Sequence, residues 1–394
     1  MKASSLFVDH FGAEPQDEWF APYRLCPLGA HVDHNLGLIT GFAINKGVRF
    51  AFSAQESGEV EAVSAQYPGA ARWSVTQTPA VKCGDWADYL RGATLELNKR
   101  FPLACGVRVA LAGELPVGGL SSSAAVTLGF LRCLCRVNRL SLPAEELIEL
   151  AYEAERNYVG VACGRLDQSC EVYGKKDHLL FMDMRDGAKK LIPQPAAMKP
   201  YRLAVIFSGL ERNLVGSKYN MRVDEAKSAA YALMAFAGLD YGKFDQAVLR
   251  DVPVAVFEAY KSRLPEPWRK RAEHWYGECE RVKQGVEAWQ NGELERFGSL
   301  VLASGRSSID LWQTGSPELI RLYELMKGTD GVYGGRFSGA GFKGCCLALL
   351  DPAKADDALE KIKRQYVRSF PGLAGRYAVC LCETADGLAK EDDL

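Results

Sequence analysis

The first hundred residues alternate between apolar and polar positions with a period of two, the pattern of β-strands that bury one face. Segments 47–53, 59–64 and 105–112 follow this pattern, and the last one ends just before Gly113. After Ser121 the apolar positions change to a helical spacing. We therefore predict a first part rich in sheet, with a strand, a loop and a helix in succession at its end.

The middle of the chain contains the change from one predicted domain to the next. An acid-rich segment at 143–155 has the pattern of a second helix. Segments 179–183 and 202–208 read as strands, and three prolines separate them. Because such proline-containing connections are common between domains, we place the boundary there and predict two domains, residues 1–195 and residues 196–394.

The second half is predicted to be helical first and mixed afterwards. Residues 220–325 show mostly amphipathic helical spacing, including 222–237 and 272–289. Near the end, strand patterns at 344–350 and 378–382 flank a helix at 353–368. A chain of 394 residues is long enough for two cores, so the predicted fold class is α+β with two domains.

Composition narrows the range of partners. The chain has 48 Lys and Arg against 49 Asp and Glu, a formal net charge of −1, so no overall attraction to nucleic acid or to an anionic membrane is expected. The N-terminus has no signal-like apolar run, and most cysteines lie in apolar stretches, which favours a cytoplasmic location. We expect a small-molecule partner; the oligomeric state stays open, and a monomer is compatible with the sequence.

The segment Leu115–Ala125 combines glycines with three consecutive serines at the start of a predicted helix. Glycines let a backbone approach a ligand closely, and the free amides of a first helical turn attract anions. An ordinary serine-capped helix would need only one serine, so a phosphate-binding loop is favoured. The predicted nucleotide contacts are Pro116, Gly118, Gly119, Leu120, Ser121, Ser122, Ser123 and Ala124.

A second glycine cluster spans 331–344, where Gly339, Gly341 and Gly344 match the spacing G-x-G-x-x-G. A dinucleotide-binding loop of that type must open a helix, whereas these glycines lead into the strand pattern that starts at Cys345. The sequence also contains no G-x-x-x-x-G-K-[ST] motif. Rossmann and P-loop sites are therefore both disfavoured.

Three segments together resemble the motifs of the GHMP kinases, a family of two-domain small-molecule kinases. Residues 21–35 are similar to the galactokinase signature, the serine loop corresponds to the second motif, and residues 332–347 to the third. The resemblance implies an N-terminal α/β domain like ribosomal protein S5, a C-terminal α+β domain and an active site in the cleft between them. It also implies ATP and Mg²⁺ as cofactors and a sugar as the phosphoryl acceptor.

The same resemblance suggests roles for single residues. Asp167, in Gly-Arg-Leu-Asp-Gln, matches the catalytic Asp of the family, and Arg24 matches the Arg of the first motif, which would stabilise transferring charge. His31, Asp33 and Tyr219 correspond to sugar-binding positions.

Metal binding is assigned in the same way. Ser122 and Glu155 match the Ser and Glu that hold Mg²⁺ in the family, in accord with the preference of this cation for oxygen ligands.

One position departs from the galactokinase pattern. That pattern has a Glu, understood to bind the 6-hydroxyl of the sugar, where this chain has Ala30. A uronic acid has a carboxylate at that carbon, and two like charges about 4 Å apart would repel by roughly 4 kcal/mol at an effective dielectric constant near 20. Together with other stretches similar to plant-type galacturonokinases, Ala30 favours D-galacturonate, phosphorylated at its anomeric hydroxyl to galacturonate 1-phosphate.

Several alternatives stay open at this point. A galactokinase could tolerate Ala30 by losing one hydrogen bond, a net cost of about 1 kcal/mol. A non-catalytic sugar sensor and a kinase for other alcohols are disfavoured by the intact Asp167 and by the first motif. The cation that would bind a uronate carboxylate is not identified, and the basic candidates are Arg72, Arg212, Lys218 and Arg222.

Overall fold

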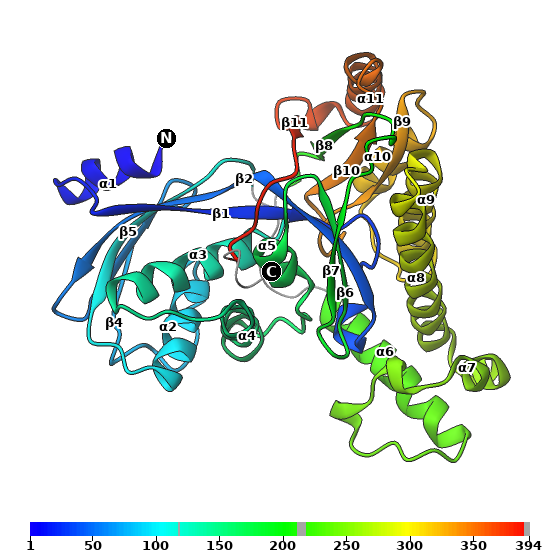
Figure 1. Ribbon diagram of the computed structural model, residues 1–394, viewed down its shortest axis with the longest axis horizontal. Coiled ribbons are helices and arrows are strands. Elements are labelled where there is room, and N and C mark those ends of the chain that lie inside the picture. Colours follow the sequence, from blue (N-terminus) through cyan, green and yellow to red (C-terminus); the bar gives the residue numbers. More distant parts are fainter. Residues whose placement is uncertain (117–118, 211–217, 390–394) are drawn as a thin grey trace.

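The computed structural model describes residues 1–116, 119–210 and 218–389, and the strands within these ranges form two sheets (Figure 1). In the first sheet the strand order is β4-β3-β5-β2-β6-β7, and β1 pairs with β2. Neighbouring strands are antiparallel except for the parallel pair β3 and β5. The strands are β1 (Asp17–Leu25), β2 (Leu38–Gln55), β3 (Glu59–Ser64), β4 (Ala70–Ser74), β5 (Gly106–Gly113), β6 (His178–Asp183) and β7 (Lys189–Pro193).

Both faces of this sheet are covered by helices. Because successive side chains of a strand point to opposite faces, Phe50 and Phe52 of β2 face the helices of the main core, while Ala51 packs with Phe7 of α1 on the other face. Figure 1 shows α1 on one side of the sheet and α2, α3 and α4 on the opposite side. These helices are α1 (Ala3–Phe11), α2 (Asp88–Arg100), α3 (Ser122–Val137), α4 (Ala144–Glu153) and α5 (Leu166–Tyr173).

The second sheet has the order β11-β8-β10-β9 and is antiparallel throughout the described residues. All six residues of β10 are buried, because one face packs against α10 and α11 and the other joins the main core. The elements are β8 (Arg202–Phe207), β9 (Val332–Phe337), β10 (Cys345–Leu350), β11 (Ala378–Cys382), α10 (Pro317–Lys327) and α11 (Ala355–Ser369).

The remaining helices connect the two sheets. The long helices α8 and α9 lie side by side (Figure 1), and α8 also contacts β2 of the first sheet. None of the helices in the described ranges is long and apolar enough to cross a membrane. These connecting helices are α6 (Lys218–Phe236), α7 (Val254–Tyr260), α8 (Glu266–Gln290) and α9 (Leu294–Asp310).

The end of the described chain returns to the first sheet. After β11, Thr384 forms a bridge with Ile44 of β2, and the amide of Leu388 donates to the carbonyl of Glu171 on α5. Residues assigned by sequence to the second domain thus pack against the first. The first sheet ends with β7 and the second begins with β8, and the proposed division between residues 195 and 196 falls between them.

Most predicted elements are present, although some differ in extent and others, such as α1 and α2, were not predicted. The strand expected at 47–53 is part of the much longer β2, and the helix expected at 143–155 ends at Glu153 and continues as the π-helical turn η2 (Ala154–Val159). Helix α2 was not predicted, because its buried positions include Asp88 and Arg91, whose polarity hides the apolar pattern.

Candidate active site

The serine loop and the third glycine motif touch each other at the start of α3. Gly119 and Gly339 both have positive φ, 85° and 67°, and a Cβ added to Gly339 would come 3.0 Å from Cα of Gly119. Ser121 also has a left-handed backbone, and its hydroxyl donates a hydrogen bond to Oδ2 of Asp167 instead of capping the helix. Close backbone contact therefore fixes the two loops against each other and against α5.

Arg24, at the end of β1, is the residue that joins these motifs. Its Nε donates to Oδ1 of Asp167 at 2.8 Å, and its Nη1 lies 3.3 Å from the carbonyl of Gly119 and from Oγ of Ser338. Burial alone would lower the pKa of this guanidinium, but the carboxylate of Asp167 offsets the effect and leaves the pKa raised. Arg24 is therefore a permanent buried cation at the meeting point of the three motifs.

A polar cavity opens beside this ion pair and contains the residues predicted to act on the sugar. Its wall includes backbone or side-chain atoms from β1, the loop after it, η2, α5, α6 and the third motif. The site residues predicted from sequence that line it are Arg24, Ala30, His31, Asp33, Gly119, Ser121, Ser123, Glu155, Asp167 and Tyr219.

Asp33 is buried in this wall as a hydrogen-bond acceptor. Its Oδ2 accepts from the amide of Leu166 at 3.2 Å, and Nδ1 of His34 lies 3.7 Å from Oδ1. Burial raises the pKa of the carboxyl, but the contacts with His34 and Leu166 outweigh it and leave the pKa below the ordinary value. Asp33 is therefore ionised at neutral pH and can accept hydrogen bonds from hydroxyl groups.

His31 lies beside Asp33 with a left-handed backbone, φ 64°. Its ring is stacked on that of Trp312, with centroids 5.2 Å apart and planes 3° apart, and the ring of Tyr219 is 6.2 Å away. Burial, then the positive charge of Arg336 and of other neighbours, lowers the pKa of His31 well below its usual range. In the protein without ligand the imidazole is therefore neutral.

Helix α8 holds the loop that contains Ala30. Oε1 of Glu278 accepts from the amide of Gly29 at 2.9 Å, and Nε2 of His274 lies 3.0 Å from the carbonyl of Ala30, to which it donates. Burial tends to raise the pKa of Glu278, but Arg281 and Arg336 lower it to about 2. Sequence reasoning missed Glu278, because a charged residue on an amphipathic helix is usually on its solvent face.

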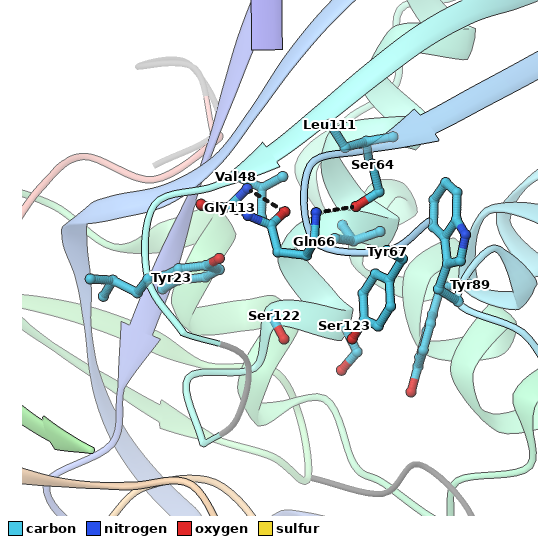
Figure 2. Close-up of a pocket in the computed structure, with 13 residues that line it drawn as sticks. Tyr23, Val48, Ser64, Gln66, Tyr67, Tyr89, Leu111, Gly113, Ser122 and Ser123 are labelled. Atoms are coloured by element: carbon cyan, nitrogen blue, oxygen red, sulfur yellow. Dashed lines mark hydrogen bonds between the residues drawn. The ribbon is translucent and has the colours of Figure 1, made fainter. Parts of the chain in front are cut away.

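An aromatic pocket on the other side of the α3 N-terminus was also missed (Figure 2). The rings of Tyr67 and Trp86 are stacked, 6.2 Å apart and 5° from parallel. Gln66 spans the strand edge, with its amide oxygen and nitrogen each 3.0 Å from the backbone of Gly113. No sequence signal indicated this pocket, because its aromatic residues come from β1, from separate loops and from α2.

The predicted nucleotide and metal contacts are distributed over both pockets and the core beside them. Ser122 lines the aromatic pocket and Glu155 lines the polar cavity, whereas Ser123 lines both. Pro116 is exposed, and Leu120 and Ala124 are buried in the core next to the loop. Gly118 lies outside the described residues.

The predicted carboxylate-binding cations are not brought to the polar cavity in the described part of the chain. Arg72 pairs with Glu61 between β4 and β3, at the edge of the first sheet, and Nη1 of Arg222 lies 3.1 Å from both carboxylate oxygens of Glu225. Lys218 is exposed at the start of α6. Arg212 lies outside the described residues.

Comparison with known families agrees with this geometry. The model of the GHMP kinases N terminal domain matches residues 88–175, and that of the GHMP kinases C terminal region matches residues 286–368. The chain belongs to the GHMP kinase family. Within it, the galactokinase galactose-binding signature matches residues 5–54, the region that contains Ala30 and Asp33.

Two relatives are similar to this GHMP kinase along nearly its whole length. A galacturonokinase of Arabidopsis thaliana is 38% identical over 390 residues, covering 93% of this chain and 91% of the relative. A galactokinase of Roseiflexus sp. (strain RS-1) is 32% identical, covering 98% and 96%. The predicted family and sugar-kinase class are confirmed, and ATP is the phosphoryl donor that this family uses.

Solved structures confirm the two-domain fold. The crystal structure of Lactococcus lactis galactokinase complexed with galactose has a TM-score of 0.88 and 26% identity, covering 98% of this chain and 97% of that one. A mevalonate kinase structure has a TM-score of 0.65 at 14% identity, covering 94% of this chain and 100% of that one, and so shares the fold.

Proposed function

We propose that this GHMP kinase phosphorylates the anomeric hydroxyl of D-galacturonate, producing galacturonate 1-phosphate and ADP. The observation that carries the proposal is Ala30, which lines the polar cavity where the galactokinase pattern has a Glu. A methyl group there removes a carboxylate that would repel the one on C6 of a uronate. The relative at 38% identity, a galacturonokinase, supports the same acceptor.

ATP would bind across the N-terminus of α3. Its adenine fits the aromatic pocket, where Tyr67 and Trp86 offer stacked faces, and its phosphates would meet the amides at the start of the helix. Ser123 lines both the aromatic pocket and the polar cavity, so the γ-phosphate would come to lie beside Arg24 and Asp167.

The ion pair suits phosphoryl transfer to a sugar hydroxyl. Asp167 would accept the proton of the anomeric hydroxyl while the oxygen of that hydroxyl bonds to the γ-phosphorus and ADP leaves. Arg24 is fixed by the serine loop and by the third motif, so it can stabilise the transferring charge without moving. Asp33 and Tyr219 would orient the other sugar hydroxyls from the cavity wall.

The donor set of the cavity fits Mg²⁺, which prefers carboxylate and hydroxyl oxygens. Glu155 is buried in the π-helical turn η2, and its Oε1 accepts a hydrogen bond from Gln168 at 3.1 Å. Glu155 and Ser123 line the same cavity, so we propose them as the protein ligands, with Ser123 in place of Ser122. Bound Mg²⁺ would neutralise charge on the phosphates.

A sugar panel tests the proposed acceptor. Purified protein should show a higher kcat/KM for galacturonate than for galactose, glucuronate or glucose, measured as sugar-dependent ADP release. A preference for galactose would instead favour galactokinase, the alternative supported by the galactose-binding signature and the relative at 32% identity. Equal turnover of mevalonate or homoserine would contradict a sugar acceptor altogether.

A further inference from the structure

The polar cavity offers few positive groups to a bound carboxylate. Among the described residues that line it, the only guanidinium is that of Arg24, and Asp167 already pairs with it. A carboxylate taken out of water without a cation or several donors is strongly disfavoured. If the acceptor is the uronate proposed above, some other group in the cavity wall must neutralise the negative charge of its carboxylate.

His31, next to Ala30, has a side chain that can take up a proton and become positively charged. It lines the cavity, and its Nε2 is buried without a hydrogen-bond partner among the described residues. The parallel indole face of Trp312, 5.2 Å away, favours an imidazolium because ring faces attract cations. His31 also has a left-handed backbone, a strained conformation that persists only where the surrounding structure holds it.

The groups that face His31 come from several elements. The imidazoles of His34 and His274 lie against the same indole as His31, and the guanidiniums of Arg336 and Arg24 act on it from β9 and β1. Asp33 and Tyr219 complete the surroundings, together with Glu278, which pairs with Arg336. Burial and then the positive neighbours lower the pKa of His31, so the ring is neutral before the sugar binds.

A bound carboxylate reverses this balance. At about 4 Å and an effective dielectric constant near 20, one negative charge shifts a protonation equilibrium by roughly a thousandfold. We infer that His31 binds the C6 carboxylate of the uronate and takes up a proton as the sugar enters. The negative charge that galactokinases place on the protein at position 30 is then supplied by the substrate, and His31 is its specificity-determining partner.

Calorimetry can detect the proton directly. Galacturonate is titrated into the wild-type protein in two buffers with different ionisation enthalpies, and galactose is titrated in parallel. We expect galacturonate to bind with uptake of up to one proton, larger at pH 6 than at pH 7.5, and galactose to bind with none, so the Kd for galacturonate should rise by up to tenfold for each unit that the pH rises. Binding of galacturonate without proton uptake would overturn the inference.

His31→Asn is the decisive variant, because Asn tolerates a left-handed backbone and can donate a hydrogen bond but cannot become charged. It should abolish proton uptake and weaken galacturonate binding by roughly a hundredfold, while galactose, which loses one hydrogen bond, weakens by roughly tenfold or less. Galactose binding by the variant also shows that it is folded. Equal losses for both sugars would assign His31 a general role and contradict the inference.

His34→Asn is the matched control, because His34 comes from the same loop and its ring lies against the same indole. It should retain proton uptake; loss of uptake here, with retention in His31→Asn, would place the proton on His34 instead. If galacturonate is not the acceptor, a different result is expected. Wild-type protein would then phosphorylate galactose but not galacturonate, which overturns the proposed function and this inference together.

Discussion

Asp167 is held by two groups from different motifs, and this position suggests the first prediction. Arg24 donates to one of its carboxylate oxygens and Ser121 to the other. Asp167→Asn keeps the size of the side chain but cannot accept a proton from the sugar, so kcat should fall by about 10²–10⁴. ATP affinity, measured by fluorescence or calorimetry, should change little, and near-normal turnover would remove Asp167 from the role of base.

Substitutions of Ala30 test which sugar the protein selects as the phosphoryl acceptor. Ala30→Glu restores the galactokinase residue, and kcat/KM for galacturonate should fall relative to that for galactose by roughly a thousandfold, the factor expected for two carboxylates about 4 Å apart. Ala30→Gln is the matched control, because it has the same length without the charge. If Glu and Gln reduce galacturonate turnover equally, size rather than charge is responsible.

Glu171 is a buried carboxyl that the proposed reaction does not use. It lies one helical turn after Asp167, it is fully buried, and neither carboxylate oxygen has a hydrogen-bond partner among the described residues. Burial and the nearby charge of Asp167 raise its pKa well above the ordinary range, so the folded protein keeps it protonated.

A pH dependence of stability follows from this raised pKa. Below the pKa of an unfolded carboxyl both states are protonated, and above it only the unfolded state releases the proton, so the native state loses stability as pH rises. Glu171→Gln should therefore raise the free energy of unfolding in urea, by little at pH 4 and by about 1.4 kcal/mol more for each further pH unit up to the folded-state pKa. The exposed Glu18→Gln should give no such trend.

At the scale of elements, the contact between the serine loop and the third motif should control ATP binding. A Cβ on Gly119 would come 2.7 Å from Sγ of Cys345 and 3.0 Å from its backbone nitrogen, at a φ of 85°. Gly119→Ala should therefore raise the KM for ATP by roughly tenfold, the equivalent of 1–2 kcal/mol of backbone strain. Gly372→Ala, which meets nothing within 4 Å, should leave it unchanged.

The predicted elements differ in how far the sequence determines them. Strands β3 and β11 were predicted with their observed bounds, because their alternation is regular and local. Helix α2 and the aromatic pocket were missed, since buried polar residues obscure the pattern of the helix and tertiary structure brings the pocket residues together. The resemblance to family motifs suggested the sugar-binding residues, whereas the hydrogen bond from Gly29 to Glu278 on α8 depends on tertiary packing that no local sequence pattern indicates.

At the scale of the whole molecule, the polar cavity has walls from both sheets and from the helices between them. Motifs near the start, the middle and the end of the chain each supply part of its wall. Helix α8 of the second half holds the loop of the first half that contains Ala30, and the last described residues pack on α5, which bears Asp167. Neither half of the chain therefore supplies the whole wall of this cavity.

The hydrogen bond from Arg24 to Ser338 joins residues 314 positions apart, and this separation has a kinetic consequence. Contacts between distant residues require closure of long chain loops and form late in folding. After dilution from urea, far-UV circular dichroism should therefore recover before sugar-dependent ADP release does. Simultaneous recovery would show that Arg24 reaches its partners as soon as the helices form. A lag would mean that nascent or partly folded chains do not consume ATP.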